Sequence, residues 1–106
     1  MLTRRLAGIG FLVVMGAGVA SAADHEVLQK DGDFARQSLM IQAGDAVLIK
    51  NEDDVAHSLI SKSAGLDLNE LQQPGDQTRI VFSNEGQWVI RCAIHPKAKL
   101  TVNVTR

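Results

Sequence analysis

Two strand-like runs flank the only cysteine of this chain, in the stretch Gln87-Trp88-Val89-Ile90-Arg91-Cys92-Ala93-Ile94-His95-Pro96-Lys97-Ala98-Lys99-Leu100-Thr101-Val102-Asn103-Val104. The runs before and after are rich in β-branched and apolar residues, which predicts two strands joined by a turn. Cys92 and His95 are three residues apart in that turn, so both side chains can point at one metal ion. A soft thiolate with imidazole ligands suits copper that changes oxidation state.

A third ligand is needed, and His57 is the natural candidate. It follows the polar turn 51–56 and leads into the strand-like run 58–61. The acidic residues of this turn, Glu52, Asp53 and Asp54, lack the spaced oxygen ligands and the glycine of an EF-hand calcium loop. We therefore interpret the acidic turn as solvated. The predicted metal site is made of His57, Cys92 and His95.

Strand signals with turns between them recur along the rest of the chain. The predicted strands cover residues 25–29, 34–42, 46–50, 58–61, 78–82, 87–91 and 100–104. Turn residues lie between them, as at Pro74-Gly75-Asp76, and Trp88 is expected in the core. The segment from Asp67 to Leu71 predicts one helical turn. About seven short strands in a chain of this size predict an all-β sandwich.

This arrangement resembles the cupredoxins, the blue copper proteins, and in particular their small plastocyanin-like and amicyanin-like members. The resemblance runs from about Phe34 to the C-terminus and rests on four segments, which are Asn51 to His57, Pro74-Gly75-Asp76, Gly86-Gln87-Trp88 and Cys92 to Pro96. It implies a Greek-key β-sandwich with one copper ion, Cu(I) or Cu(II), on His57, Cys92 and His95. It also implies single-electron transfer without catalysis, so we expect no enzyme.

The chain departs from the family pattern at three positions. Ala98 stands where the shorter-loop members have an axial methionine ligand, and alanine cannot bind copper. The only methionine outside the N-terminal region is Met40. It lies inside a strand-like run, so we expect it to be a core residue and not the axial ligand. Ser58 and Ala93 replace the Asn and the Ser or Thr that tie the two ligand loops together in the family. We therefore expect a weaker brace, and copper that is three-coordinate or takes water or a backbone oxygen as a fourth ligand.

The resemblance also implies how the protein meets its partner. His57 would be the buried ligand, and His95 would lie near the surface with its ring edge as the exit for the electron. Ile94, Pro96 and Ala98 would form an apolar docking patch, while Lys97 and Lys99 would favour an acidic rim on the partner. The implied partner is a c-type cytochrome or a dehydrogenase that binds transiently, and we expect a monomer.

The N-terminus reads as a secretory signal peptide. Arg4 and Arg5 precede the apolar segment 6–20, and the small residues 20–23 fit a cleavage site. We therefore divide the chain into a signal peptide, residues 1–22, and a copper-binding domain, residues 23–106. Cleavage would leave an exported periplasmic protein without stable membrane insertion. A single thiol in an oxidising compartment needs an explanation, and a metal thiolate supplies one.

The charge of the predicted domain argues against one class of partner, and other interpretations of the same residues lead to other functions. Residues 23–106 carry nine basic and twelve acidic side chains, which gives no reason to expect nucleic acid. If cleavage follows Ala22, His25 is the third residue, and a second Cu(II) site of amine, amide and imidazole nitrogens becomes conceivable. The simpler interpretation places His25 in the first strand.

A copper carrier or copper-tolerance protein is the alternative function. Zinc is chemically possible, and a Cys92–His95 enzyme lacks an orienting third group.

Overall fold

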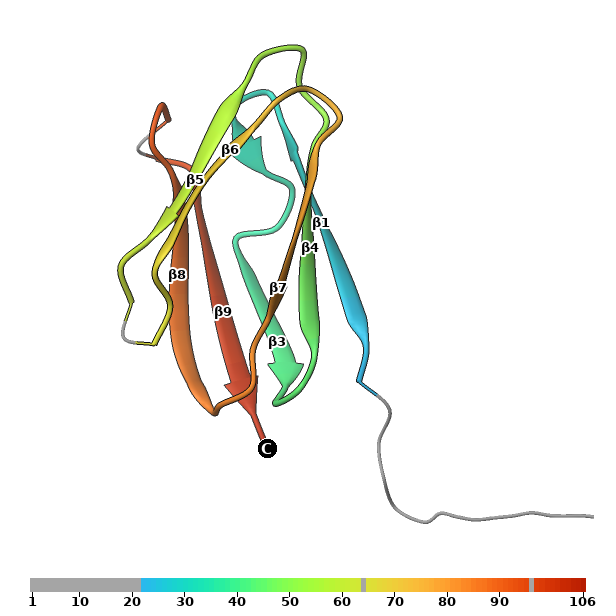
Figure 1. Cartoon of the computed structure of the whole chain (residues 1–106), viewed down its shortest axis with the longest axis vertical. Helices are drawn as coiled ribbons and strands as arrows, with labels where there is room; N and C mark the ends of the chain where they lie inside the picture. Colours follow the sequence, from blue (N-terminus) through green and yellow to red (C-terminus); the bar gives the residue numbers. More distant parts are fainter. Residues whose placement is uncertain (1–21, 64, 96) are drawn as a thin grey trace, which may run out of the picture.

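The protein is a sandwich of two β-sheets (Figure 1). The computed structural model describes residues 22–63, 65–95 and 97–106, and the part of the chain it describes contains no helix. The strands are β1 (Asp24–Lys30), β2 (Asp33–Phe34), β3 (Ser38–Gln42), β4 (Ala46–Asn51), β5 (His57–Ser61), β6 (Leu68–Gln72), β7 (Gln77–Val81), β8 (Gly86–Cys92) and β9 (Lys99–Thr105). The predicted all-β Greek-key sandwich is confirmed.

The two sheets are both mixed. One has the strand order β2-β1-β4-β7, and the other has the order β3-β9-β8-β5-β6. Strands β1 and β4 pair in parallel, as do β3 and β9, while the remaining pairs are antiparallel. Figure 1 shows the two layers facing each other, with the β4–β5 and β8–β9 connections at the same end. This end brings the predicted ligands together.

Alternating burial along the strands builds the core between the layers. On β8 the side chains of Trp88, Ile90 and Cys92 point inward, and Trp88 contacts the ring of Phe82 with a centroid separation of 5.5 Å. Burying each large apolar side chain stabilises the fold by about 1.5–3 kcal/mol. Cys92 lies at the end of this inward series, so the same alternation that fills the core also aims its sulfur.

Two sequence-based expectations about the strands are wrong. The predicted helical turn at Asp67 to Leu71 falls on β6, which pairs with β5 along its whole length. Pairing with β5 decides the conformation there, because a short polar segment has little helical preference of its own. Met40 is 72% exposed, not buried. Its neighbours Leu39 and Ile41 face the core, so the period of a strand places Met40 on the outer surface.

The β1–β2 turn has a left-handed backbone at two successive residues. Asp31 has a φ of 55° and Gly32 a φ of 74°, the combination that tight two-residue hairpins use. The turn lies at the ligand end of the sandwich.

No helix within the described ranges is long and apolar enough to cross a membrane. The predicted signal peptide falls on residues 1–22, of which 1–21 lie outside the described residues.

Candidate metal centre

The structure brings His57, Cys92 and His95 together at one point. The Cys92 sulfur lies 3.3 Å from His57 Nδ1 and 3.8 Å from His95 Nδ1. The three ligand atoms all lie within 4.8 Å of one another. Such separations fit donors around one ion, because typical metal bonds are about 2.0 Å to nitrogen and about 2.3 Å to sulfur. His57 begins β5, Cys92 ends β8, and His95 lies in the loop that leads to β9.

The three side chains differ in their access to solvent. His57 and Cys92 are buried, whereas His95 is only partly buried. The two imidazole rings lie 5.2 Å apart between centroids, at an angle of 53°. Solvent therefore reaches this cluster on the side of His95, as the resemblance implied.

Asp53 holds the His57 ring. His57 Nε2 lies 2.5 Å from Asp53 Oδ2, and because a carboxylate can only accept, the proton is on Nε2. This tautomer leaves Nδ1 unprotonated and turned toward the Cys92 sulfur. Asp53 was interpreted as a solvated turn residue, which is wrong, because its side chain is only 11% exposed. An Asp four residues before a ligand His was the available signal.

The same carboxylate also holds the β1–β2 turn. Its oxygens accept hydrogen bonds from the amides of Asp31 (2.6 Å) and Gly32 (3.1 Å). Burial works to raise the pKa of Asp53, but the hydrogen bonds from His57 and from the two amides outweigh it and lower the pKa below its usual value. Asp53 is therefore an anion that joins a ligand to a neighbouring turn.

A buried polar network supports the turn that carries Asp53. Asn51 Oδ1 accepts a hydrogen bond from the Asp53 amide (2.9 Å), and Asn51 Nδ2 donates to the carbonyls of Val55 and Gln72. The Gln72 side chain in turn donates to the Ile49 carbonyl (2.7 Å) and accepts from Gln29 (2.6 Å). Buried amides fully engaged in this way fix one arrangement of the loop.

Gly32 packs against the edge of the His95 ring. A Cβ atom built on Gly32 would lie 2.9 Å from both Cδ2 and Nε2 of His95, closer than carbon atoms tolerate. The φ of 74° also disfavours other residues there. The sequence places this glycine between the predicted strands 25–29 and 34–42 but gives no sign of the ring beside it. The β1–β2 turn therefore limits the positions that His95 can take.

Backbone hydrogen bonds connect the ligand loops at Ser58 and Ala93. The sequence predicted a weak connection there, because these two side chains differ from those of the family. The Ala93 amide donates to the Ser58 carbonyl (2.9 Å), so each of the two positions contributes its main chain. The Ala98 amide donates to the His95 carbonyl (2.8 Å). Ala98 is 1% exposed, which contradicts its predicted place in a docking patch. Of that patch, Ile94 is exposed and Pro96 lies outside the described residues.

His25 is a strand residue, as the simpler interpretation held. Its Nε2 lies 2.9 Å from Asp45 Oδ2, and Asp45 Oδ1 accepts from the Ala23 amide (3.0 Å). Hydrogen bonds from the amide of Ala23, from His25 and from the amide of Gln42 lower the pKa of Asp45 to about 2. A square-planar Cu(II) site at His25 would have to break these bonds and the pairing of β1 with β4.

Solved structures place this architecture among known proteins. A purple cupredoxin from Nitrosopumilus maritimus matches with a TM-score of 0.67 and 23% identity, over 76% of this chain and 99% of that one. Amicyanin from Paracoccus versutus matches with a TM-score of 0.68 and 21% identity, over 82% of this chain and 84% of that one. The chain has the cupredoxin fold. The predicted cupredoxin resemblance is thereby confirmed.

Two curated proteins are similar in sequence to this cupredoxin-fold chain. The methylamine utilization protein MauL of Methylophilus methylotrophus is 32% identical over 88 residues, which cover 77% of this chain and 51% of the relative. MauL of Methylorubrum extorquens is 26% identical over 106 residues, covering 98% of this chain and 93% of the relative. The chain thus spans about half the length of the first relative. No protein-family model matches the sequence.

Proposed function

We propose that this protein is a copper-binding electron carrier that uses His57, Cys92 and His95 to hold one copper ion. The observation that supports this most is a buried cysteine sulfur between two imidazoles, one buried and one partly exposed. A mixed set of one thiolate and two imidazoles stabilises both Cu(I) and Cu(II). Bound copper would supply the one-electron chemistry, and the chain would supply the ligands and their fixed positions.

The contacts around the three ligands limit how far their side chains can move when the copper changes oxidation state. Asp53 fixes the His57 ring, Gly32 limits His95, and the Ala93–Ser58 hydrogen bond joins the strands that end at the site. Ala98 presents a methyl group where the family has a thioether, so the protein supplies three ligands from its side chains. This donor set would favour Cu(I) if water stays out of the site. His95, the most exposed ligand, offers the electron a path to the surface.

The location and partners are also part of the proposal. The segment 1–22 supports export to the periplasm, with residues 23–106 as the functional domain. The similar proteins are named for methylamine utilization and as amicyanin, and one similar amicyanin structure is of a Cu(I) form. We infer a monomeric carrier that meets its redox partner, a c-type cytochrome or a dehydrogenase, transiently. It carries electrons and catalyses no reaction of its own.

A visible and EPR titration tests the proposal. One equivalent of Cu(II) added to the exported protein should give an intense thiolate-to-copper absorption band and a narrow copper hyperfine splitting. Cys92→Ser should abolish the band, while Ser83→Ala, a change in an exposed turn, should leave it intact. A pale spectrum of nitrogen and oxygen ligands would refute the electron carrier. If that pale signal then disappears in His25→Ala, the copper-carrier alternative takes its place.

A further inference from the structure

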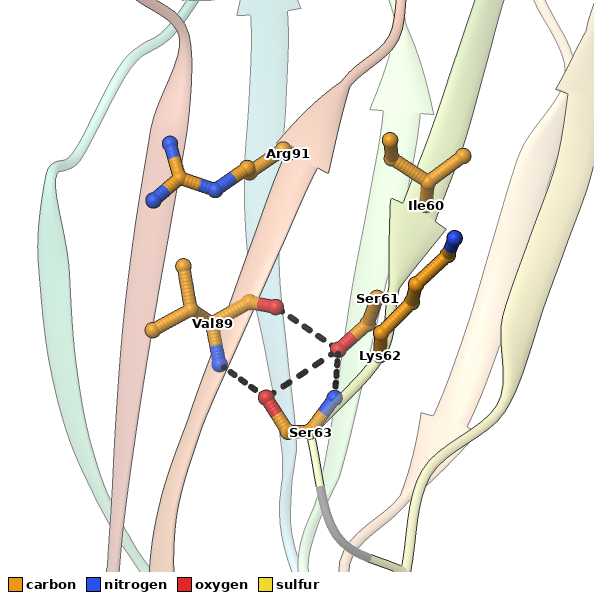
Figure 2. A pocket seen from close by; sticks show the side chains of 6 residues that line it. All are labelled: Ile60, Ser61, Lys62, Ser63, Val89 and Arg91. Carbon is orange, nitrogen blue, oxygen red and sulfur yellow. Dashed lines mark hydrogen bonds between the residues drawn. The ribbon is translucent and has the colours of Figure 1, made fainter.

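Asp45 is the only buried carboxylate in the part of the chain that the structure describes. It directly precedes β4, at the opposite end of that strand from the ligand loops, and is only 6% exposed. The other buried polar side chains outside the metal centre are uncharged and bond to uncharged groups. In the hollow between β5 and β8, for example, the Ser61 hydroxyl donates to the Val89 carbonyl (2.7 Å), and the Ser63 hydroxyl accepts from the Val89 amide (3.1 Å) (Figure 2). Asp45 differs because it brings a formal charge into the interior.

Three donors surround the Asp45 carboxylate. Oδ1 accepts a hydrogen bond from the Ala23 amide (3.0 Å), while Oδ2 lies 2.9 Å from His25 Nε2 and accepts from the Gln42 amide (3.1 Å). These bonds lower the pKa of Asp45 to about 2, so the carboxylate is an anion at neutral pH. Two of the donors are amides and the third is an imidazole, so none carries a permanent positive charge. A buried anion is expected to have a cationic partner.

The chain can supply such a cation at Ala23. Two peptide bonds fit cleavage between small residues, the bond from Ala22 to Ala23 and the bond from Ala23 to Asp24. Hydrolysis of the first bond takes up one water, leaves a carboxylate on Ala22 and turns the Ala23 nitrogen into an α-ammonium group. Hydrolysis of the second bond removes Ala23, so Asp45 loses one donor and the Ala46 amide loses the Ala23 carbonyl that it contacts at 2.9 Å. Only the first bond leaves these contacts in place.

The surroundings of Ala23 suit an ammonium group. Ala23 is exposed, so one proton can point at the Asp45 carboxylate while the others reach water. Such a charge-assisted hydrogen bond is roughly twice as strong as the neutral one that it replaces. The neighbouring carboxylate of Asp24 is exposed and already pairs with Arg79, at 3.1 Å between Oδ1 and Nη2. Asp45 is therefore the favoured partner of a new N-terminus at this position.

We propose that the exported chain begins at Ala23 and that its α-ammonium group binds Asp45. The inference rests on the proposed export and goes beyond it, because it assigns the processed bond and the carboxylate that receives the new terminus. Asp45 also holds His25, which becomes the third residue of the exported chain. An amine and an imidazole so placed could bind Cu(II) together with two backbone nitrogens. With both groups on Asp45, Cu(II) capture at the N-terminus is weakened.

The mass of the exported protein tests the processed bond. The full chain, expressed with its own residues 1–22 and recovered from the periplasm of a bacterial host, should have the mass of residues 23–106. A mass of residues 24–106, or any other start, would overturn the inference. Recovery of the chain with residues 1–22 still attached would overturn the proposed export as well.

Thermal unfolding of two apo chains tests the ammonium–carboxylate contact. Chain 23–106 carries the ammonium at Ala23, whereas chain 22–106 keeps an amide there and moves the charge one residue away. Chain 23–106 should have a Tm about 4 °C higher, because only its N-terminus makes the charge-assisted bond. Asp45→Asn should remove this difference, and Asp24→Asn, which removes an exposed carboxylate beside the same nitrogen, should preserve it. Equal Tm values for the two wild-type chains, or a difference that Asp24→Asn also removes, would contradict the contact.

A competition titration with a second equivalent of Cu(II) tests the effect on copper. In chain 23–106, Asp45→Asn should bind this second ion about tenfold more tightly than wild type, because the amine and His25 are then released. Chain 22–106 is the control, because His25 is its fourth residue, and Asp45→Asn should bring it no such gain. Equal second-ion affinities of wild type and Asp45→Asn in chain 23–106 would refute the weakening of Cu(II) capture. The thiolate-to-copper band is read in the same samples, so a chain that begins at Ala23 but lacks the band would refute the electron carrier and leave the N-terminal contact standing.

Discussion

Asp53 is expected to tune the metal centre as well as to hold the fold, and Asp53→Asn separates the two effects. The carboxylate accepts three hydrogen bonds, from His57 Nε2 and from the amides of Asp31 and Gly32. An amide in its place keeps one acceptor oxygen and turns an NH₂ group toward a donor. At least one hydrogen bond to a charged group is lost, and the others lose their charge assistance.

The stability loss follows from those three bonds. A hydrogen bond to a charged group contributes about 1.5–3 kcal/mol and a neutral one about 0.5–1.5 kcal/mol, so Asp53→Asn should lower the free energy of unfolding by about 3 kcal/mol. For a domain of this size, that lowers Tm by roughly 12–24 °C. Thermal unfolding of the apo protein measures this effect without any contribution from copper.

The effect of Asp53→Asn on copper binding should be measurable separately from its effect on stability. An orienting carboxylate makes a ligand histidine more basic, and its loss typically weakens metal affinity about 10–100-fold. The neutral amide should weaken Cu(II) binding more than Cu(I) binding, because Cu(II) gains more from a basic ligand. If Cu(I) affinity is unchanged, the reduction potential rises by about 60–120 mV. Competition titration of Cu(II) and potentiometry measure the two quantities.

Asp54→Asn is the matched control. Asp54 is exposed and carries the same charge one residue away, so its replacement should leave Tm, Cu(II) affinity and the potential close to those of wild type. If Asp53→Asn lowers Tm but binds Cu(II) as tightly as wild type, with the same potential, then Asp53 only clamps the β1–β2 turn, and the argument that it tunes His57 is refuted.

Three further changes test other parts of the structure. Gly32→Ala should perturb the copper spectrum, because its Cβ meets His95 at 2.9 Å, and Gly44→Ala, equally strained at a φ of 98° but without contacts, should cost a similar ~1–2 kcal/mol while leaving the spectrum intact. Ala98→Met should sharpen the blue-copper signal and lower the potential, and an unchanged spectrum and potential would show that position 98 does not face the metal. Because the pKa of Asp45 is lowered from 3.8 to about 2, its contribution to stability is complete above about pH 4 and is lost as the pH falls toward 2. Urea unfolding of Asp45→Asn should show a weaker dependence on pH in that window, and an identical dependence in both proteins would contradict the assignment.

The ligands and most of the strands could be predicted from sequence because both leave local patterns. Alternation places Trp88, Ile90 and Cys92 on one face, and the Cys-x-x-His spacing marks the loop beside them. The same alternation, applied strictly, would also have placed Met40 outside. β6 was missed because its strand character comes from pairing with β5 and not from its own residues.

The support around the ligands could not be predicted in the same way. Asp53 and the Asp31 amide are 22 positions apart, and nothing near either residue signals the other. The approach of Gly32 to His95 depends on how two loops meet at one end of the sandwich. Contacts of this kind follow from the closed fold, so a sequence reveals the donor atoms more readily than the groups that hold them in place.

The parallel pairing of β3 with β9 has a consequence for how the protein folds. Ser38 pairs with Thr101, 63 positions later in the sequence, and β1 and β4 are also joined across intervening strands. Topologies dominated by such distant pairings fold slowly, in about milliseconds to seconds. The connection between Cys92 and β9 becomes fixed only when β9 docks beside β3 and β8. Copper should therefore bind a nearly finished sandwich, slowing its unfolding far more than it speeds its folding.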